Sequence, residues 1–299
     1  MNNSPLSKCP VCDSKAWNKV YEDELGSTPP TVDYRFSPQT RKTYQVVECC
    51  VCTHRYVHPQ PKLDGLYEAN QDPTYLSSIR QRRRSAQEWV QIVEAFNIEA
   101  VSLLDIGCAT GVFLDEAAKR YTVEGIELSH WAADVASRSH IVHRKPVSEA
   151  QLRSTFDIAT LWGVIEHLEC PKRELTAINA VLNDYGTLFI YTGNRSALIP
   201  RILGKRWWWY QGMHIQYFSD ATLSRILAEC GFRVIAKRNL PIYFSVRSLG
   251  QSLNRYKFAK PLVWLMQRLP TERLLIRVKV SGEMLIVAQK LSGNRAKPE

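Results

Sequence analysis

An apolar run that ends in a glycine turn, "VSLLDIGCATGVFLDEAAKR" at 101–120, constrains this chain more than any other segment. Residues 101–106 have the composition of a buried strand, and an amphipathic helix is expected directly after Gly111. A glycine turn between a strand and a helix lets a ligand approach the backbone closely. The segment therefore predicts a small-molecule site at the end of a strand.

The residues around this turn narrow the choice of ligand. Gly107 and Gly111 are spaced as G-x-x-x-G, unlike the G-x-G-x-x-G of dinucleotide sites, and Asp105 precedes them. This carboxylate would repel a pyrophosphate but suits an ammonium group. About 20 residues after Gly107, a second predicted strand in "VEGIELS" ends at Glu127, which can accept hydrogen bonds from both ribose hydroxyls. S-adenosylmethionine has the ammonium group and the ribose and lacks a phosphate, so we expect it as the cofactor.

Together with four further segments, these two resemble the class I S-adenosylmethionine-dependent methyltransferases. "LLDIGCATG" is similar to the first motif of that family, and "VEGIELS" to the acidic end of its second strand. The others resemble the fourth strand with its following helix, the fifth strand, the helix before the sixth strand, and the last strand. They are "FDIATLWGVIEHLECP", "LNDYGTLFIYTGN", "HIQYFSDATLSRILAECGF" and "GEMLIVAQK". The resemblance covers residues 100–240 and 282–290.

The resemblance implies an α/β fold with a Rossmann-like sheet of seven strands, the last one antiparallel. It implies that Glu127 holds the ribose, that Leu128 and Val147 flank the adenine, and that Trp162 lies under the cofactor. The turn residues that would surround the rest of the cofactor are Asp105, Gly107, Cys108, Ala109 and Gly111. Many members of the family have glycine at the position of Ala109. An alanine is tolerable there if its φ is negative.

Methyl transfer from a sulfonium requires an aligned nucleophile, and a general base where the nucleophile holds its proton tightly. Such groups are expected at the carboxyl ends of the strands, where open α/β sheets bind ligands. "VIEHLECP" places Glu166 and His167 there, and "MHIQYF" places His214 and Tyr217 there. We favour His214 as the base, with His167 as the alternative. Some similar quinone O-methyltransferases bind a divalent metal through E-x-x-E-H. The first glutamate of that motif is Gly163 here, which argues against a catalytic metal.

Two C-x2-C pairs, "CPVC" and "CCVC", precede this domain. Four thiolates are the ligands of a structural zinc site and leave no open coordination position, so we predict a folding role. The predicted ligands are Cys9, Cys12, Cys49 and Cys52. Cys50 is spare, and His54 and His58 are less plausible ligands. Such a module resembles a methyltransferase subgroup that includes sugar C-methyltransferases and enzymes of polysaccharide biosynthesis.

We divide the chain into a zinc-ribbon-like module at 1–62, connecting helices at 63–100, and a methyltransferase domain at 101–299. In methyltransferases of this class the connection after the fifth strand overhangs the active site, so 195–219 is expected to form a lid. This lid contains "RWWWYQGMHIQYF", with Trp207, Trp208 and Trp209. We expect these rings to exclude water, to stack on an acceptor or to pack inward, and at least one only to pack inward. Arg206 could neutralise an anionic acceptor.

The net charge is +10, and much of it lies near a predicted helical insertion at 241–281. Between Lys237 and Lys279 there are ten lysines and arginines against one acid. Basic amphipathic helices can cap the acceptor pocket, contact anionic lipid at a membrane surface or form a homodimer, and we keep all three alternatives. The arginines at 80–84 either attract an anionic partner or form a solvated helix face.

These features predict a methyltransferase for a small-molecule or glycan acceptor, such as a nucleotide sugar or a lipid-linked glycan, modified on oxygen. An RNA methyltransferase is the main alternative, because positive charge suits phosphate contacts. The charge lies in an apolar-rich insertion, however, so nucleic acid is the less favoured partner. A non-catalytic scaffold is the third reading, against which the cofactor motifs argue. No run approaches the roughly 18 apolar residues of a membrane span, and no signal-peptide pattern begins the chain. We therefore expect a cytoplasmic protein, either free or peripheral to a membrane.

Overall fold

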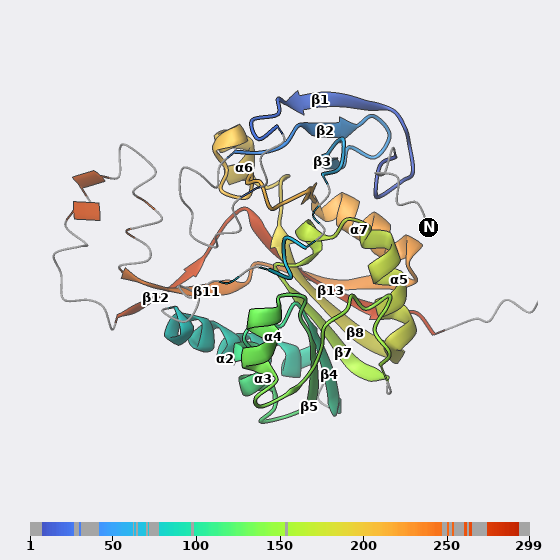
Figure 1. Cartoon of the computed structure of the whole chain (residues 1–299), viewed down its shortest axis with the longest axis vertical. Helices are drawn as coiled ribbons and strands as arrows, with labels where there is room; N and C mark the ends of the chain where they lie inside the picture. The colour runs from blue at the N-terminus through green and yellow to red at the C-terminus, as the bar shows by residue number, and fades with distance from the viewer. Residues whose placement is uncertain are drawn as a thin grey trace, which may run out of the picture.

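A central sheet with helices on both faces forms the body of the protein in a computed structural model of the chain (Figure 1). The structure describes residues 8–26, 30, 42–61, 63, 65–69, 71, 78–96, 99–152, 155–246, 250, 253, 260–261, 263–264 and 274–292. Within these ranges, no helix has both the length and the apolar character that a membrane span requires.

The central sheet contains seven strands among the described residues. In sheet order they are β10 (Phe232–Arg238), β13 (Glu283–Lys290), β8 (Leu182–Gly193), β7 (Phe156–Trp162), β4 (Ser102–Ile106), β5 (Thr122–Ile126) and β6 (Ile141–His143). β13 runs antiparallel to both of its neighbours, and the other pairings in the sheet are parallel. The predicted Rossmann-like architecture with an antiparallel last strand is confirmed.

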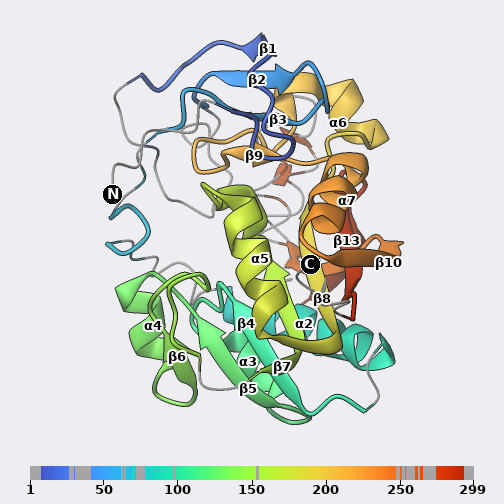
Figure 2. The same cartoon turned by 90° about the vertical axis from the view of Figure 1, so that its right-hand side faces the viewer.

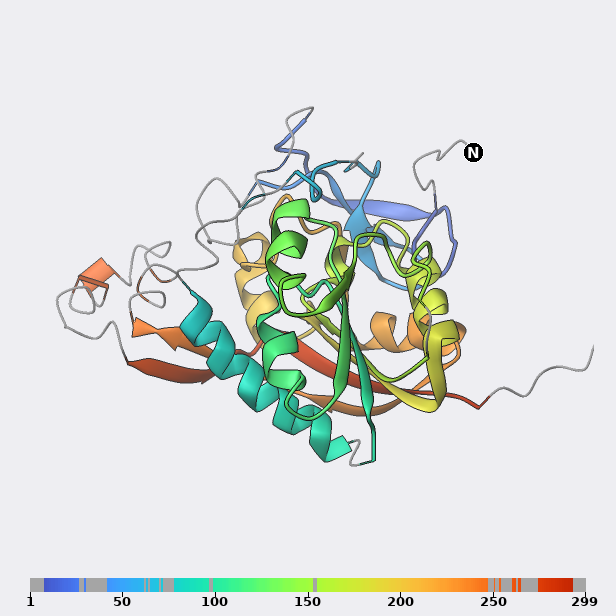
Figure 3. The ribbon, with the colours of Figure 1, turned by 60° about the horizontal axis from the view of Figure 1, so that its bottom comes forward.

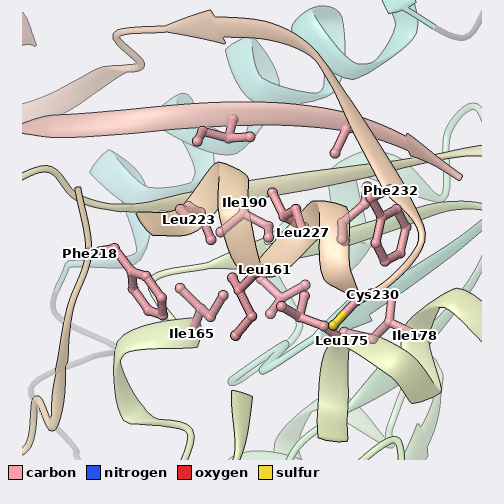
Figure 4. Packing of buried hydrophobic residues seen from close by; sticks show 14 of the residues in the cluster. Leu161, Ile165, Leu175, Ile178, Ile190, Phe218, Leu223, Leu227, Cys230 and Phe232 are labelled. Atoms are coloured by element: carbon pink, nitrogen blue, oxygen red, sulfur yellow. The ribbon is translucent and has the colours of Figure 1, made fainter. Parts of the chain in front are cut away.

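Successive residues of the strands point to opposite faces and build two separate cores. Leu104 and Ile190 join one core, which α5 (Pro171–Val181) and α7 (Asp220–Glu229) cover. The close view in Figure 4 shows Leu175, Ile178, Leu223 and Leu227 of these helices meeting Leu161 and Ile190. The neighbouring residues Leu103 and Phe189 face the other core, with α2 (Ile79–Phe96) and α3 (Val112–Ala117). The nearly continuous apolar strands follow from this burial on both faces.

The predicted helical insertion at 241–281 begins and ends with strands instead. β11 (Pro241–Ser245) pairs antiparallel with β12 (Leu275–Lys279), continuing the β10–β13 pair beyond a short break. The β11–β12 pair lies along α2 (Figure 3), where Trp89 Nε1 donates to the Pro241 carbonyl at 2.9 Å. Most of 247–273 lies outside the described residues, so the proposed pair of helices stays a prediction.

The predicted zinc module forms a small antiparallel sheet that takes one strand from the segment after β8. Its first three strands are β1 (Trp17–Tyr21), β2 (Val46–Cys49) and β3 (Arg55–Val57). The fourth is β9 (Gln216–Tyr217), which lies near the end of 206–218, the tryptophan segment. Figure 2 shows β9 beneath β3, above the central sheet. The module is therefore bound, through backbone hydrogen bonds, to the segment that is predicted to form the lid.

Candidate active site

The turn after β4 requires glycine at its first position. A Cβ on Gly107 would lie 2.5 Å from Cγ2 of Val164, and the Gly107 φ is +75°. The φ of Ala109 is +49°, so the negative φ under which an alanine was expected to fit is not met. An L-residue in this left-handed region costs about 1–2 kcal/mol, which its surroundings must offset. The Ala109 N–H contributes by donating to Glu127 Oε2 at 2.8 Å.

Glu127 ties this turn to the end of β5. Its other carboxylate oxygen, Oε1, accepts a hydrogen bond from the backbone N–H of Ser129 at 2.7 Å. Burial raises the pKa of the Glu127 carboxyl. A carboxylate oxygen accepts more than one hydrogen bond, so both oxygens keep the capacity to bind a ribose. Leu128 is half-buried beside it, whereas Val147 is buried in the core with Ile126.

Asp105 is buried at the end of β4, where Thr160 Oγ1 donates to its Oδ1 at 2.6 Å. Burial raises the pKa of Asp105 to about 8, and the nearby charge of Glu127 adds to the effect. The free protein therefore holds much of this carboxyl protonated at neutral pH. A cation placed beside it would favour the ionised form.

Two further residues of the expected cofactor site make contacts within the protein. The thiol of Cys108 packs so closely on β5 that a Cβ added to Gly125 would lie 2.6 Å from its Sγ. The Trp162 ring lies at the tip of β7 as expected, with ring centroids 4.8 Å from Trp89 and 5.1 Å from Phe113. The contribution of Cys108 to a cofactor would therefore come from its backbone.

Two neutral histidines face each other above the ends of β7 and β8. Their rings are perpendicular, with centroids 4.7 Å apart. His167 Nδ1 lies 2.9 Å from the Met213 carbonyl oxygen, and His214 Nδ1 lies 2.8 Å from that of Trp209. A carbonyl only accepts hydrogen bonds, so each Nδ1 carries the hydrogen and each Nε2 keeps its lone pair. Burial lowers the pKa of His167 to about 4 and the pKa of His214 well below its ordinary value.

Glu166 lies buried next to this pair. Its Oε2 accepts from Thr192 Oγ1 at 2.8 Å, and burial raises its pKa to about 8. One possible ligand atom each from Glu166, His167 and His214 lie within 4.8 Å of one another. Two imidazoles with fixed tautomers and a carboxylate are a donor set for a divalent transition metal. Gly163 removes one carboxylate from the E-x-x-E-H pattern, whereas the fold brings in His214 as a further donor.

Three further residues contact the histidines or their backbone, and of these only Tyr217 was predicted. Tyr217 is buried, and its hydroxyl donates to the His214 carbonyl at 2.7 Å, a contact that supports the backbone. Gln211 and Tyr67 were not predicted. The Gln211 amide donates to His214 Nε2 at 3.3 Å, and the Tyr67 hydroxyl lies 3.0 Å from His167 Nδ1. Both residues are polar positions in irregular segments, where no periodicity marks a buried contact.

The three tryptophans take different environments. Trp207 is only 1% exposed, which confirms that at least one ring packs inward, and Trp209 is also buried. Trp208 is half-buried. Its Nε1 donates to Glu283 Oε1 at 3.0 Å, and Trp209 Nε1 donates to the same oxygen at 3.3 Å. Tyr191 OH donates to the other oxygen of Glu283. One buried carboxylate thus binds three aromatic side chains. Arg206, which was predicted to face an anionic acceptor, is exposed.

The paired cysteines converge in the N-terminal module. Cys9 and Cys52 Sγ atoms are 3.5 Å apart, as are those of Cys12 and Cys49, and all four lie within 4.8 Å of one another. A tetrahedral zinc with Zn–S bonds of about 2.3 Å places its sulfurs about 3.8 Å apart, so the spacing fits. Cys50 is exposed. Asp13 and Thr53 give each knuckle a positive φ.

Comparison with known proteins identifies the domain that carries the histidine site. Residues 78–237, more than half of the chain, match the family model described as "Methyltransferase domain". This chain belongs to the methyltransferase domain family. The enzyme class expected from the turn after β4 and the acid at the end of β5 is thereby confirmed at the level of the family.

Curated relatives and solved structures agree with this assignment. Over 118 residues the chain is 31% identical to the mitochondrial ubiquinone biosynthesis O-methyltransferase of Candida albicans, covering 34% of this chain and 35% of that protein. It is 27% identical over 118 residues to a ubiquinone biosynthesis O-methyltransferase of Pseudomonas fluorescens (strain Pf0-1), covering 36% and 50%. The chain thus spans half or less of these relatives. A SAM-dependent methyltransferase of Archaeoglobus fulgidus shares the fold, with a TM-score of 0.52 and 17% identity over 73% of this chain and all of that one.

Proposed function

We propose that this protein transfers the methyl group of S-adenosylmethionine to an oxygen atom of a small, ring-bearing acceptor held beneath the tryptophan segment. The proposed acceptor class includes nucleotide sugars, lipid-linked glycans and ring-hydroxylated small molecules. The curated relatives are named as O-methyltransferases of ubiquinone biosynthesis. One observation carries the proposal. Two imidazoles, fixed as neutral Nδ1–H tautomers, stand above the ends of β7 and β8. Ligands of open α/β sheets bind at these ends.

The hydrogen bonds favour His167 over His214 as the proton acceptor. His214 Nε2 already accepts from Gln211, and the ring packs against Trp209 with centroids 4.9 Å apart and the ring planes tilted by 33°. Within the described residues, His167 Nε2 has no hydrogen-bond partner, and its side chain is only half-buried. We infer that His167 takes the proton and that the His214 ring positions the His167 ring.

A base of low pKa suits this displacement. As the acceptor oxygen forms its bond to the methyl carbon, the carbon–sulfur bond breaks and S-adenosylhomocysteine leaves. The oxygen becomes strongly acidic during this step, so a weak base can accept its proton. With a pKa of about 4, His167 is neutral at physiological pH and can therefore accept a proton. A divalent ion on Glu166, His167 and His214 would instead lower the pKa of the acceptor hydroxyl.

The four clustered cysteines are proposed to hold a structural zinc. The site would be closed, since four thiolates fill its coordination sphere. Its contribution would be to folding of the module and, through β9, to the segment that carries His214.

Methyl-labelled cofactor tests the proposed function. The chain is incubated with labelled S-adenosylmethionine and separate pools of ring-hydroxylated metabolites, nucleotide sugars, lipid-linked glycans and RNA. We expect the label in an alkali-stable methyl ether of a small or lipid-linked acceptor. Label in RNA would instead support the RNA alternative, and failure to bind the cofactor in calorimetry would support a scaffold.

A further inference from the structure

The helix that leads into the tryptophan segment exposes an apolar face. α6 (Leu198–Leu203) is followed by a short 3-10 turn, Gly204–Arg206, and then by Trp207. Ile202 and Leu198 are 72% and 66% exposed, more than any other large apolar side chain in the described part of the chain. They are four residues apart, so they lie on one face of the helix.

This outward face is fixed by contacts on the inner side of α6. Pro200 is buried and packs on Gly282, where a Cβ would lie 3.1 Å from Pro200 Cδ. Leu203 packs on the core that contains Trp207. Rotation of the helix to hide Leu198 and Ile202 would pull Pro200 and Leu203 out of these contacts.

The charged residues in the stretch that contains this face are all positive. Residues 194–210 contain Arg195, Arg201, Lys205 and Arg206 and no acid. Arg201, which precedes Ile202 in α6, and Arg206, at the end of the following 3-10 turn, are both exposed. Lys205 is paired with Glu24 at 2.8 Å, so it adds less free charge. An apolar pair flanked by arginines matches the boundary between acyl chains and anionic headgroups.

We propose that Leu198, Ile202, Arg201 and Arg206 form a docking face for an anionic lipid bilayer. Two apolar side chains on a single short helix present far less than the roughly 800 Å² per partner of a stable protein interface. A bilayer accepts such a small contact, because a few inserted side chains and nearby cations give weak, reversible binding. Docking there brings the tryptophan segment to the membrane surface. The proposal concerns membrane binding alone and is independent of the acceptor.

Vesicle flotation with the full chain tests the docking face. Vesicles of phosphatidylcholine are compared with vesicles that also contain phosphatidylglycerol. We expect the bound fraction to depend on the anionic lipid and to fall with added salt. Leu198→Glu combined with Ile202→Glu should weaken binding by about tenfold or more, and Arg201→Gln with Arg206→Gln by several-fold.

A matched control uses Ile141→Glu, since Ile141 is 62% exposed on β6, far from α6 in Figure 2. This variant should bind vesicles like the unmodified chain. Circular dichroism and cofactor calorimetry show that each variant is folded. Undiminished vesicle binding by the folded α6 variant would overturn the proposal, and so would the absence of binding by the unmodified chain. If the unmodified chain does not bind vesicles and the α6 variant differs from it in oligomeric state, this face is instead a contact between copies of the chain.

Discussion

His214 donates the hydrogen on its Nδ1 to the backbone carbonyl of Trp209 at 2.8 Å. The Trp209 ring packs against the same imidazole, with the ring centroids 4.9 Å apart and the planes tilted by 33°. A residue of the tryptophan segment therefore sets both the tautomer and the orientation of a proposed active-site group. The three adjacent tryptophans differ in their contacts because the segment is irregular there, between the 3-10 turn and β9.

The first prediction separates the two histidines. His167→Ala should lower kcat by about 10²–10⁴-fold, the usual contribution of a general base, with little change in cofactor Kd. His214→Ala should have a smaller effect on kcat, because this ring is proposed to position its neighbour. The exposed His130 provides a control, His130→Ala, expected to retain full turnover. If His214→Ala were the more damaging substitution, the assignment of the base would be reversed.

The second prediction concerns protons and cofactor binding. The pKa of Asp105 is about 8 in the free protein, and a bound ammonium should lower it. Binding below pH 8 then releases a proton, so affinity should rise with pH, by up to about tenfold per unit, and level off above pH 8. Calorimetry in buffers of different ionisation enthalpy measures the released proton directly.

Substitution of the acid completes that test. Asp105→Asn should abolish both the proton release and the pH slope, whereas the exposed Asp184→Asn should keep both. A slope that survives in Asp105→Asn would assign the proton to another group, with Glu127 the next candidate.

The central sheet and the turn after β4 were predictable because they rest on local pattern. Apolar runs marked the strands, and the requirement for glycine is visible in the 2.5 Å approach of Val164 to Gly107. The 241–281 segment was harder, since apolar residues such as Ile242 and Phe244 suit a strand as well as a helix. Only the pairing of β11 with β12, more than thirty residues later in the chain, decides the strand.

Long-range contacts explain what the sequence could not reveal of the site. β9 has two residues, too few for any periodicity, and its partner β3 lies far away in the chain. The side-chain oxygen Oε1 of Gln216 in β9 accepts a hydrogen bond from His54 Nε2 at 2.9 Å, a contact across the same gap. Glu283 reads as a polar residue at the start of an apolar strand. Its three aromatic donors come from β8 and the lid.

The third prediction tests Glu283 as the group that holds the lid. Glu283→Gln keeps the shape but replaces one accepting oxygen by an NH2 group that faces N–H or O–H donors. The mismatch should lower the free energy of unfolding by about 1–3 kcal/mol. The rings of Trp208 and Trp209 should become more exposed to water, which shifts tryptophan fluorescence emission to longer wavelength.

A matched substitution at an exposed acid, Glu99→Gln, should leave both the emission and the stability unchanged. The turnover of Glu283→Gln should fall together with the emission shift, because Trp209 also orients His214. Unchanged emission in a folded Glu283→Gln protein would show that the carboxylate does not hold the lid.

The fourth prediction links the cysteine cluster to the active site. Cys9→Ser should remove bound zinc, and the exposed Cys50→Ser, a neighbour of Cys49, should retain it. Without the metal, β3 should lose its fixed position, and with it the pairing of Arg55 and Tyr56 with β9. Hydrogen exchange should therefore increase in peptides covering 211–218 as well as in the module. Turnover should fall in Cys9→Ser because this segment carries His214, and chelation of zinc from the unmodified protein should reproduce both effects. Exchange confined to 8–57 after zinc loss would instead show that the module folds independently of the lid.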